Sequence, residues 1–163
     1  MKKIMLIISV ITLFSACKKD FFVWKNYNEE KYEEYKKNLG NNGLLDLDTC
    51  WVSNSSRLLV EVIHFAQTKK MPKLSSVVTC KYSGFLVDGT RFEYSENSSF
   101  LVENTIKGWK EILCQMPQGS RFRIYVPYEL GYGKEGRKGN TFVIPPYSTL
   151  IFNIEIIDVT NTP

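Results

Sequence analysis

The chain has 163 residues, enough for one domain with some additional sequence. Its formal net charge at pH 7 is +4, of which Lys2 and Lys3 supply +2. A charge this small gives no indication of a nucleic-acid partner. Aromatic residues make up 13% of the chain, with ten Phe, nine Tyr and three Trp. This surplus of rings favours a protein with an aromatic cavity.

The N-terminus reads "MKKIMLIISVITLFSAC". Two lysines precede an apolar run over residues 4–14, which is too short for a permanent membrane span, and Ser15 and Ala16 lead into Cys17. We therefore predict a signal peptide over residues 1–16. Small residues directly before a cysteine resemble the bacterial lipoprotein signal, which implies that Cys17 is lipidated and that the exported protein is membrane-anchored, on the periplasmic side or the cell surface. An ordinary secretory signal or an uncleaved anchor are the alternatives.

Residues 17–56 are expected to form the lipidated cysteine, a tether and one short helix. Asn28 is a good helix cap, acidic residues follow it, lysines stand in the last turn, and Gly40 lies just beyond. This helix carries a thin stripe of Tyr32, Tyr35 and Leu39. The stripe could serve dimerisation, but three turns offer little area, so we favour a spacer packed loosely on the domain.

From Arg57 onward the pattern changes to strands with one apolar and one polar face. The alternating segments are "RLLVEVIHF", "SSVVTCKYSGFLV", "SRFRIYVP" and, near the C-terminus, "TLIFNIEI". One helix interrupts them, "TIKGWKEILCQM", with Ile106, Trp109, Leu113 and Met116 on one face. A single helix on a half-buried antiparallel sheet predicts an α+β domain, which we place at residues 57–160.

The remaining chemistry is restricted. The only histidine is His64, on a predicted strand, so a catalytic triad or a histidine metal site has little material and we expect a surface residue. Cys50, Cys80 and Cys114 form an odd set without zinc spacing. We expect Cys80 and Cys114 to be small buried residues, while the state of Cys50 stays open. The glycines of "LGYGKEGRKGN" indicate a flexible hairpin, since the ending of a phosphate loop is missing. We expect neither metal nor cofactor.

Three sequence motifs follow one another along the chain: "VTCKYSGFLVDGTRFEYS", "IKGWKEILCQMPQGSRFRIYVPYELGYG" and "VIPPYSTLIFNIEI". Together they resemble the three signature blocks of the FKBP-type peptidyl-prolyl isomerases, over about half of the chain. The resemblance implies a twisted antiparallel sheet wrapped around one short helix, with an aromatic pocket between them.

The resemblance also assigns residues. It implies a catalytic set of Tyr82, Phe92, Glu93 and Tyr132. It implies a substrate-binding set of Phe100, Ile106, Trp109, Ile144 and Phe152, with Trp109 as the floor and the backbone amide of Ile106 as a donor. Pro145 and Pro146 would set the turn before the last strand. Glu93 stands where the family usually has aspartate, so we expect a displaced contact with Tyr82 and reduced activity.

The implied activity is cis/trans isomerisation of X-Pro bonds in exported proteins. The implied partners are proline-containing polypeptides, the membrane through the lipid anchor, and macrolide inhibitors. Rotation of the amide needs no nucleophile, because a dry pocket with fixed donors can bind the twisted amide better than either isomer. The alternative is a non-catalytic chaperone or peptide-binding module that uses the same cleft. A tethered surface protein with a vestigial pocket is more remote.

Overall fold

The computed structural model describes residues 2–41, 50–52, 56–139 and 142–161. Side chains are described from residue 20 to 39 and from residue 56 onward within these ranges. The side chains of Cys17 and Cys50 therefore lie outside the described part. The lipid anchor stays a prediction, and the state of Cys50 stays open.

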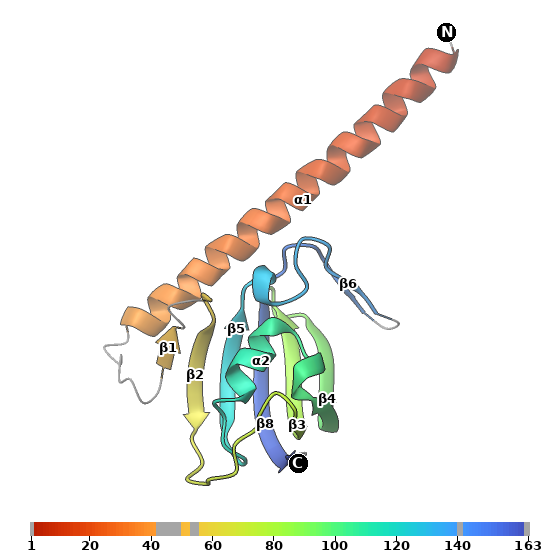
Figure 1. The fold of residues 1–163 in the computed structure, drawn as a ribbon. Coiled ribbons are helices and arrows are strands. Elements are labelled where there is room, and N and C mark those ends of the chain that lie inside the picture. The colour runs from red at the N-terminus through yellow and green to blue at the C-terminus, as the bar shows by residue number, and fades with distance from the viewer. Residues whose placement is uncertain (1, 42–49, 53–55, 140–141, 162–163) are drawn as a thin grey trace.

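The described residues form a six-stranded sheet in the order β1-β2-β5-β8-β3-β4, and every neighbouring pair is antiparallel. The strands are β1 Cys50–Val52, β2 Leu59–His64, β3 Val77–Leu86, β4 Arg91–Leu101, β5 Arg121–Val126 and β8 Leu150–Thr160. Helix α2, Lys107–Leu113, lies across one face of the sheet (Figure 1). The predicted α+β class, an antiparallel sheet around one short helix, is confirmed.

Shorter elements connect the strands. The 3₁₀ turns are η1 Val102–Asn104 and η2 Tyr128–Leu130. The glycine-containing loop forms a hairpin of β6 Arg137–Lys138 and β7 Val143–Ile144, which projects beyond the main sheet (Figure 1). The predicted hairpin is thus present, with a defined register.

The core lies between the sheet and α2. In β8 the inward residues Leu150, Phe152, Ile154 and Ile156 are at most 2% exposed, as their alternation predicts. Helix α2 approaches the sheet closely, since a Cβ added at Gly108 would lie 2.8 Å from Cγ1 of Val126. Only glycine permits this approach, which sets the depth of the helix over the sheet.

Helix α1 differs from the sequence-based expectation. It runs without interruption over Lys2–Asn41, and its N-terminal part extends past the domain (Figure 1). Asn28 is therefore not a cap but an interior residue. The physical reason is that no proline occurs in this segment and its first glycine is Gly40, so nothing breaks the helix. No helix among the described residues is both long and apolar enough to cross a membrane.

The C-terminal half of α1 also packs more tightly than a loose spacer would. Tyr32 is 2% exposed and clusters with Leu59 and Tyr125, and its hydroxyl donates to the carbonyl of Arg57. The rings of Tyr35 and Tyr125 lie 4.7 Å apart between centroids. The expectation of loose packing is wrong, because the tyrosine stripe covers the outer face of β2 and β5.

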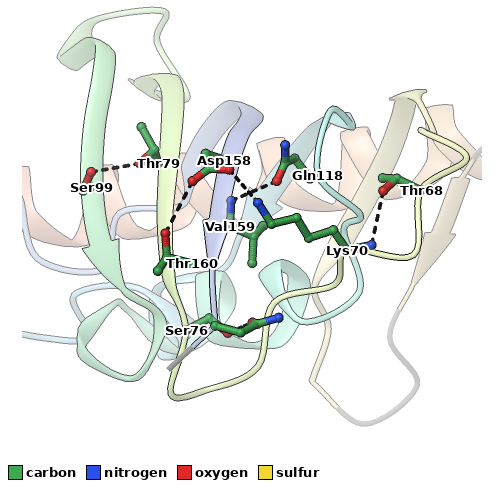
Figure 2. A network of polar contacts seen from close by, with 10 residues as sticks. Thr68, Lys70, Ser76, Thr79, Ser99, Gln118, Asp158, Val159 and Thr160 are labelled. Carbon is green, nitrogen blue, oxygen red and sulfur yellow. Dashed lines mark hydrogen bonds and ion pairs between the residues drawn. The ribbon is translucent and has the colours of Figure 1, made fainter. Parts of the chain in front are cut away.

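A polar network holds the connection between β2 and β3, and the segment between α2 and β5, against the end of β8 (Figure 2). Lys70 Nζ lies 2.8 Å from Asp158 Oδ1, and the backbone N–H of Val159 donates to Oε1 of Gln118 over 3.1 Å. An exposed ion pair of this kind contributes little stability, whereas the backbone contact satisfies a buried donor. The network lies at the end of β8 away from the β6–β7 hairpin (Figure 1).

Two smaller expectations can be checked directly. Cys80 is a free, fully buried thiol, and burial raises its pKa from 9.0 to about 12. Cys114 is also free but only partly buried. His64 is exposed at the end of β2, as expected.

Candidate active site

The floor of the site is an aromatic cluster around Trp109, which α2 places 5% exposed over the sheet. Its ring lies edge-on to those of Tyr82, Phe100 and Phe152, at centroid distances of 5.1, 5.6 and 5.3 Å. Edge-to-face pairs of this kind stabilise one another beyond their buried area. The cluster therefore presents a fixed apolar surface assembled from α2, β3, β4 and β8.

One wall is formed by Tyr82 of β3 and Glu93 of β4. The Tyr82 hydroxyl donates to Glu93 Oε1 over 2.9 Å. Burial, followed by this hydrogen bond and the charge of Glu93, raises the pKa of Tyr82 above its ordinary value. The expected displacement of the Glu93 contact is thus not found, because the carboxylate of the longer glutamate side chain still accepts from the Tyr82 hydroxyl.

A second wall carries Tyr132, which follows η2, and Arg137, the first residue of β6. Arg137 Nη1 donates to the Tyr132 hydroxyl oxygen over 2.7 Å, and its guanidinium carbon lies 5.2 Å from the centre of the Tyr132 ring. Sequence analysis found Tyr132 but missed Arg137. The sequence carries only a weak indication that Arg137 belongs to the site. That indication is its position in the loop that leads to Ile144.

These walls enclose a cavity of about 370 Å³. It is lined by Tyr82, Glu93, Phe100, Leu101, Asn104, Thr105, Ile106, Trp109, Tyr132, Arg137 and Phe152. Seven of the nine residues predicted for the pocket are thus brought together. Ile106 stands as the residue before α2, with extended backbone at φ −63° and ψ 157°.

The other two predicted residues, Phe92 and Ile144, lie beside the cavity rather than on its lining. Phe92 packs edge-on against Phe152 at 5.6 Å, and a Cβ on Gly84 would lie only 2.6 Å from its ring. Ile144 is 4% exposed and pairs with Arg137 across the β6–β7 hairpin. Phe92 and Ile144 therefore contact residues that line the cavity without lining it themselves.

The cavity is apolar below and polar at its rim. The indole nitrogen of Trp109 is buried and has no hydrogen-bond partner in the described part of the chain. Among the same residues no group of His, Cys, Asp and Glu could hold a metal ion. The arrangement suits a ligand with an apolar ring against Trp109 and a carbonyl at the rim, where hydroxyl and amide donors stand.

Comparison with known proteins agrees with this geometry. The family model "FKBP-type peptidyl-prolyl cis-trans isomerase" matches residues 68–157. The isomerase FkpA of Escherichia coli is 36% identical over 140 residues, which cover 83% of this chain and 48% of FkpA. The outer membrane protein MIP of Legionella longbeachae is 41% identical over 98 residues, covering 58% of this chain and 41% of that protein. The crystal structure of Escherichia coli FkpA matches with a TM-score of 0.76 and 30% identity, over 96% of this chain and 73% of that one.

An antiparallel sheet around one helix, with an aromatic cavity floored by tryptophan, is the architecture of a prolyl isomerase domain. The chain belongs to the FKBP-type peptidyl-prolyl cis-trans isomerase family. It spans about half the length of the curated relatives it matches.

Proposed function

We propose that this protein catalyses cis/trans isomerisation of X-Pro bonds in exported polypeptides. The observation that carries the proposal is the Tyr82–Glu93 hydrogen bond of 2.9 Å at the rim of a cavity floored by Trp109. This constellation combines an apolar surface for the proline ring with a fixed polar wall beside the amide.

Catalysis would be non-covalent. The X-Pro amide resists rotation with a barrier of about 20 kcal/mol, because twisting it breaks the resonance between nitrogen and carbonyl. A twisted amide has less charge separation than a planar one, because its resonance is lost, so a dry aromatic surface favours it over the planar ground states. The oxygen of Tyr132 accepts from Arg137, which leaves the Tyr132 hydrogen free to hold the substrate carbonyl. The backbone N–H of Ile106 would hold a second carbonyl.

The test is direct measurement of exchange in an X-Pro peptide by NMR with the whole chain added. Catalysed exchange supports the enzyme. Measured without a coupling protease, the rate reports on the isomerase alone. No acceleration together with binding of unfolded chains would instead identify a chaperone or peptide-binding module using the same cavity.

The same proposal includes location and partners. The apolar run before Cys17 supports export, and the residues preceding Cys17 support lipidation there. The name of the Legionella longbeachae relative, an outer membrane protein, agrees with a membrane-anchored form. Proline-containing exported proteins are the proposed clients, and the aromatic cavity supports binding of macrolide inhibitors.

A further inference from the structure

Arg137 occupies a position that the hairpin determines closely. It pairs with Ile144 in the β6–β7 ladder, and the preceding Gly136 has φ +69°. A Cβ added at Gly136 would lie 2.2 Å from the carbonyl oxygen of Ile144, so only glycine permits this path. The backbone therefore holds the base of the Arg137 side chain at the wall of the cavity.

The guanidinium of Arg137 has more N–H donors than its contact with Tyr132 uses. One of its five N–H groups goes to the Tyr132 hydroxyl. No carboxylate in the described part of the chain forms an ion pair with Arg137. The hydrogen bond with Tyr132 raises the pKa of Arg137 above its already high ordinary value, so the group is charged in every ordinary buffer. The cavity rim thus carries a cation that forms no direct ion pair with the described residues.

The second charge at the cavity is that of Glu93, which also acts on Arg137. Glu93 Oε1 accepts the Tyr82 hydroxyl, and this contact directs the carboxylate toward β3. The Glu93 carboxylate therefore lies beside the Tyr82 hydroxyl, whereas the Arg137 cation lies beside the Tyr132 hydroxyl. Of these two charges, Arg137 is the one in contact with the Tyr132 hydroxyl, so it is expected to act on a substrate group held there.

The expected substrate path leads past this cation. If the Tyr132 hydroxyl holds the carbonyl of residue X in X-Pro, the side chain of X begins one atom from that carbonyl. Arg137 Nη1 is 2.7 Å from the same hydroxyl oxygen. We propose that Arg137 makes the site prefer an acidic residue immediately before the proline. This inference rests on the proposed isomerase function.

The experiment compares peptides Ala-X-Pro-Phe with X as Glu or Gln, which have nearly the same shape and differ in charge. NMR exchange gives kcat/KM for each with the full chain. We expect the Glu peptide to exceed the Gln peptide about fivefold at low ionic strength, the upper range for an exposed ion pair, since the Arg137 side chain is exposed. The ratio should approach one at about 0.5 M salt, because screening weakens the pair.

Variants then assign the effect. Arg137→Gln should bring the Glu/Gln ratio to one, while Arg137→Lys should keep part of it. The matched control is Arg121→Gln, which removes an exposed arginine of β5 outside the cavity lining and should leave the ratio unchanged. A wild-type ratio of one, or a ratio that survives Arg137→Gln, overturns the inference while the Gln peptide is still isomerised. If neither peptide is accelerated, the isomerase function itself has failed.

Discussion

The side-chain oxygen of Asn28, in the middle of α1, accepts a hydrogen bond of 2.8 Å from the backbone N–H of Thr149, 121 residues further along the chain. The other end of the Asn28 amide donates to the carbonyl of Trp24 over 2.9 Å. Trp24 in turn donates to Ser148, which donates to the carbonyl of Pro145. Helix α1 therefore holds the turn that joins the β6–β7 hairpin to β8.

Replacing Asn28 tests this attachment. Asn28→Ala leaves the Thr149 N–H without its acceptor at a site where Thr149 is 3% exposed. We expect the free energy of unfolding to fall by about 1–3 kcal/mol, the cost of a buried unsatisfied donor. Urea unfolding measures the change, and Glu30→Ala, an exposed position on the same helix, is the control. Equal stability of the two variants would contradict the role of Asn28.

The Tyr82–Glu93 contact leads to a prediction about activity. Tyr82→Phe removes the hydroxyl that binds Glu93 and should lower kcat/KM about tenfold, since a hydrogen bond to a charged group is worth about 1.5–3 kcal/mol. Glu93→Asp should stay within about threefold of the wild type, because the 2.9 Å contact shows no misplacement for aspartate to correct. A large gain from Glu93→Asp would mean that the observed contact is not the productive one.

Trp109 can report on occupancy of the cavity. A macrolide of the class that inhibits this family should alter the fluorescence of Trp109, since the ring of the ligand would lie on the indole of Trp109. Trp24 and Trp51 also emit, so the change is measured as the difference between the wild type and Trp109→Phe. The substitution should break no hydrogen bond, because the indole nitrogen has no partner in the described residues. An unchanged difference spectrum at saturating ligand would indicate a closed cavity.

The buried thiol of Cys80 predicts a loss of stability in alkali. Its pKa is raised from 9.0 to about 12 in the folded protein, so the unfolded chain releases this proton first as pH rises. Stability from this group is complete below pH 9 and is lost between pH 9 and 12, by about 1.4 kcal/mol for each unit. Cys80→Ala should show a shallower decline between pH 8 and 10 in urea unfolding. Parallel declines would contradict the assignment.

The lipid anchor is tested at Cys17. Cys17→Ala should release the protein from the membrane fraction or leave it unprocessed, because a thiol is needed to carry the acyl chains. Mass spectrometry of the wild-type N-terminus gives the second readout. A mature chain that begins elsewhere, without acyl mass, would exclude the lipoprotein form.

Much of the fold follows from local patterns. The alternation of Leu150, Phe152 and Ile154 determines which side of β8 faces the core, since a strand has a side-chain period of two and water excludes apolar side chains. The apolar spacing around Trp109 determines the inward face of α2 in the same way. Both signals lie within a few residues, so they can be read before any tertiary contact is known.

The contacts of Asn28 and Arg137 could not be read in this way. Asn28 is of a residue type common at helix N-caps, which suggests a local role. Its actual partner, Thr149, comes close only when α1 packs against the folded sheet. Arg137 reaches the cavity because a hairpin register pairs it with Ile144. Such contacts depend on the direction of a long helix and on pairing between distant segments, which are set by the packing energy of the whole domain rather than by any short stretch of residues.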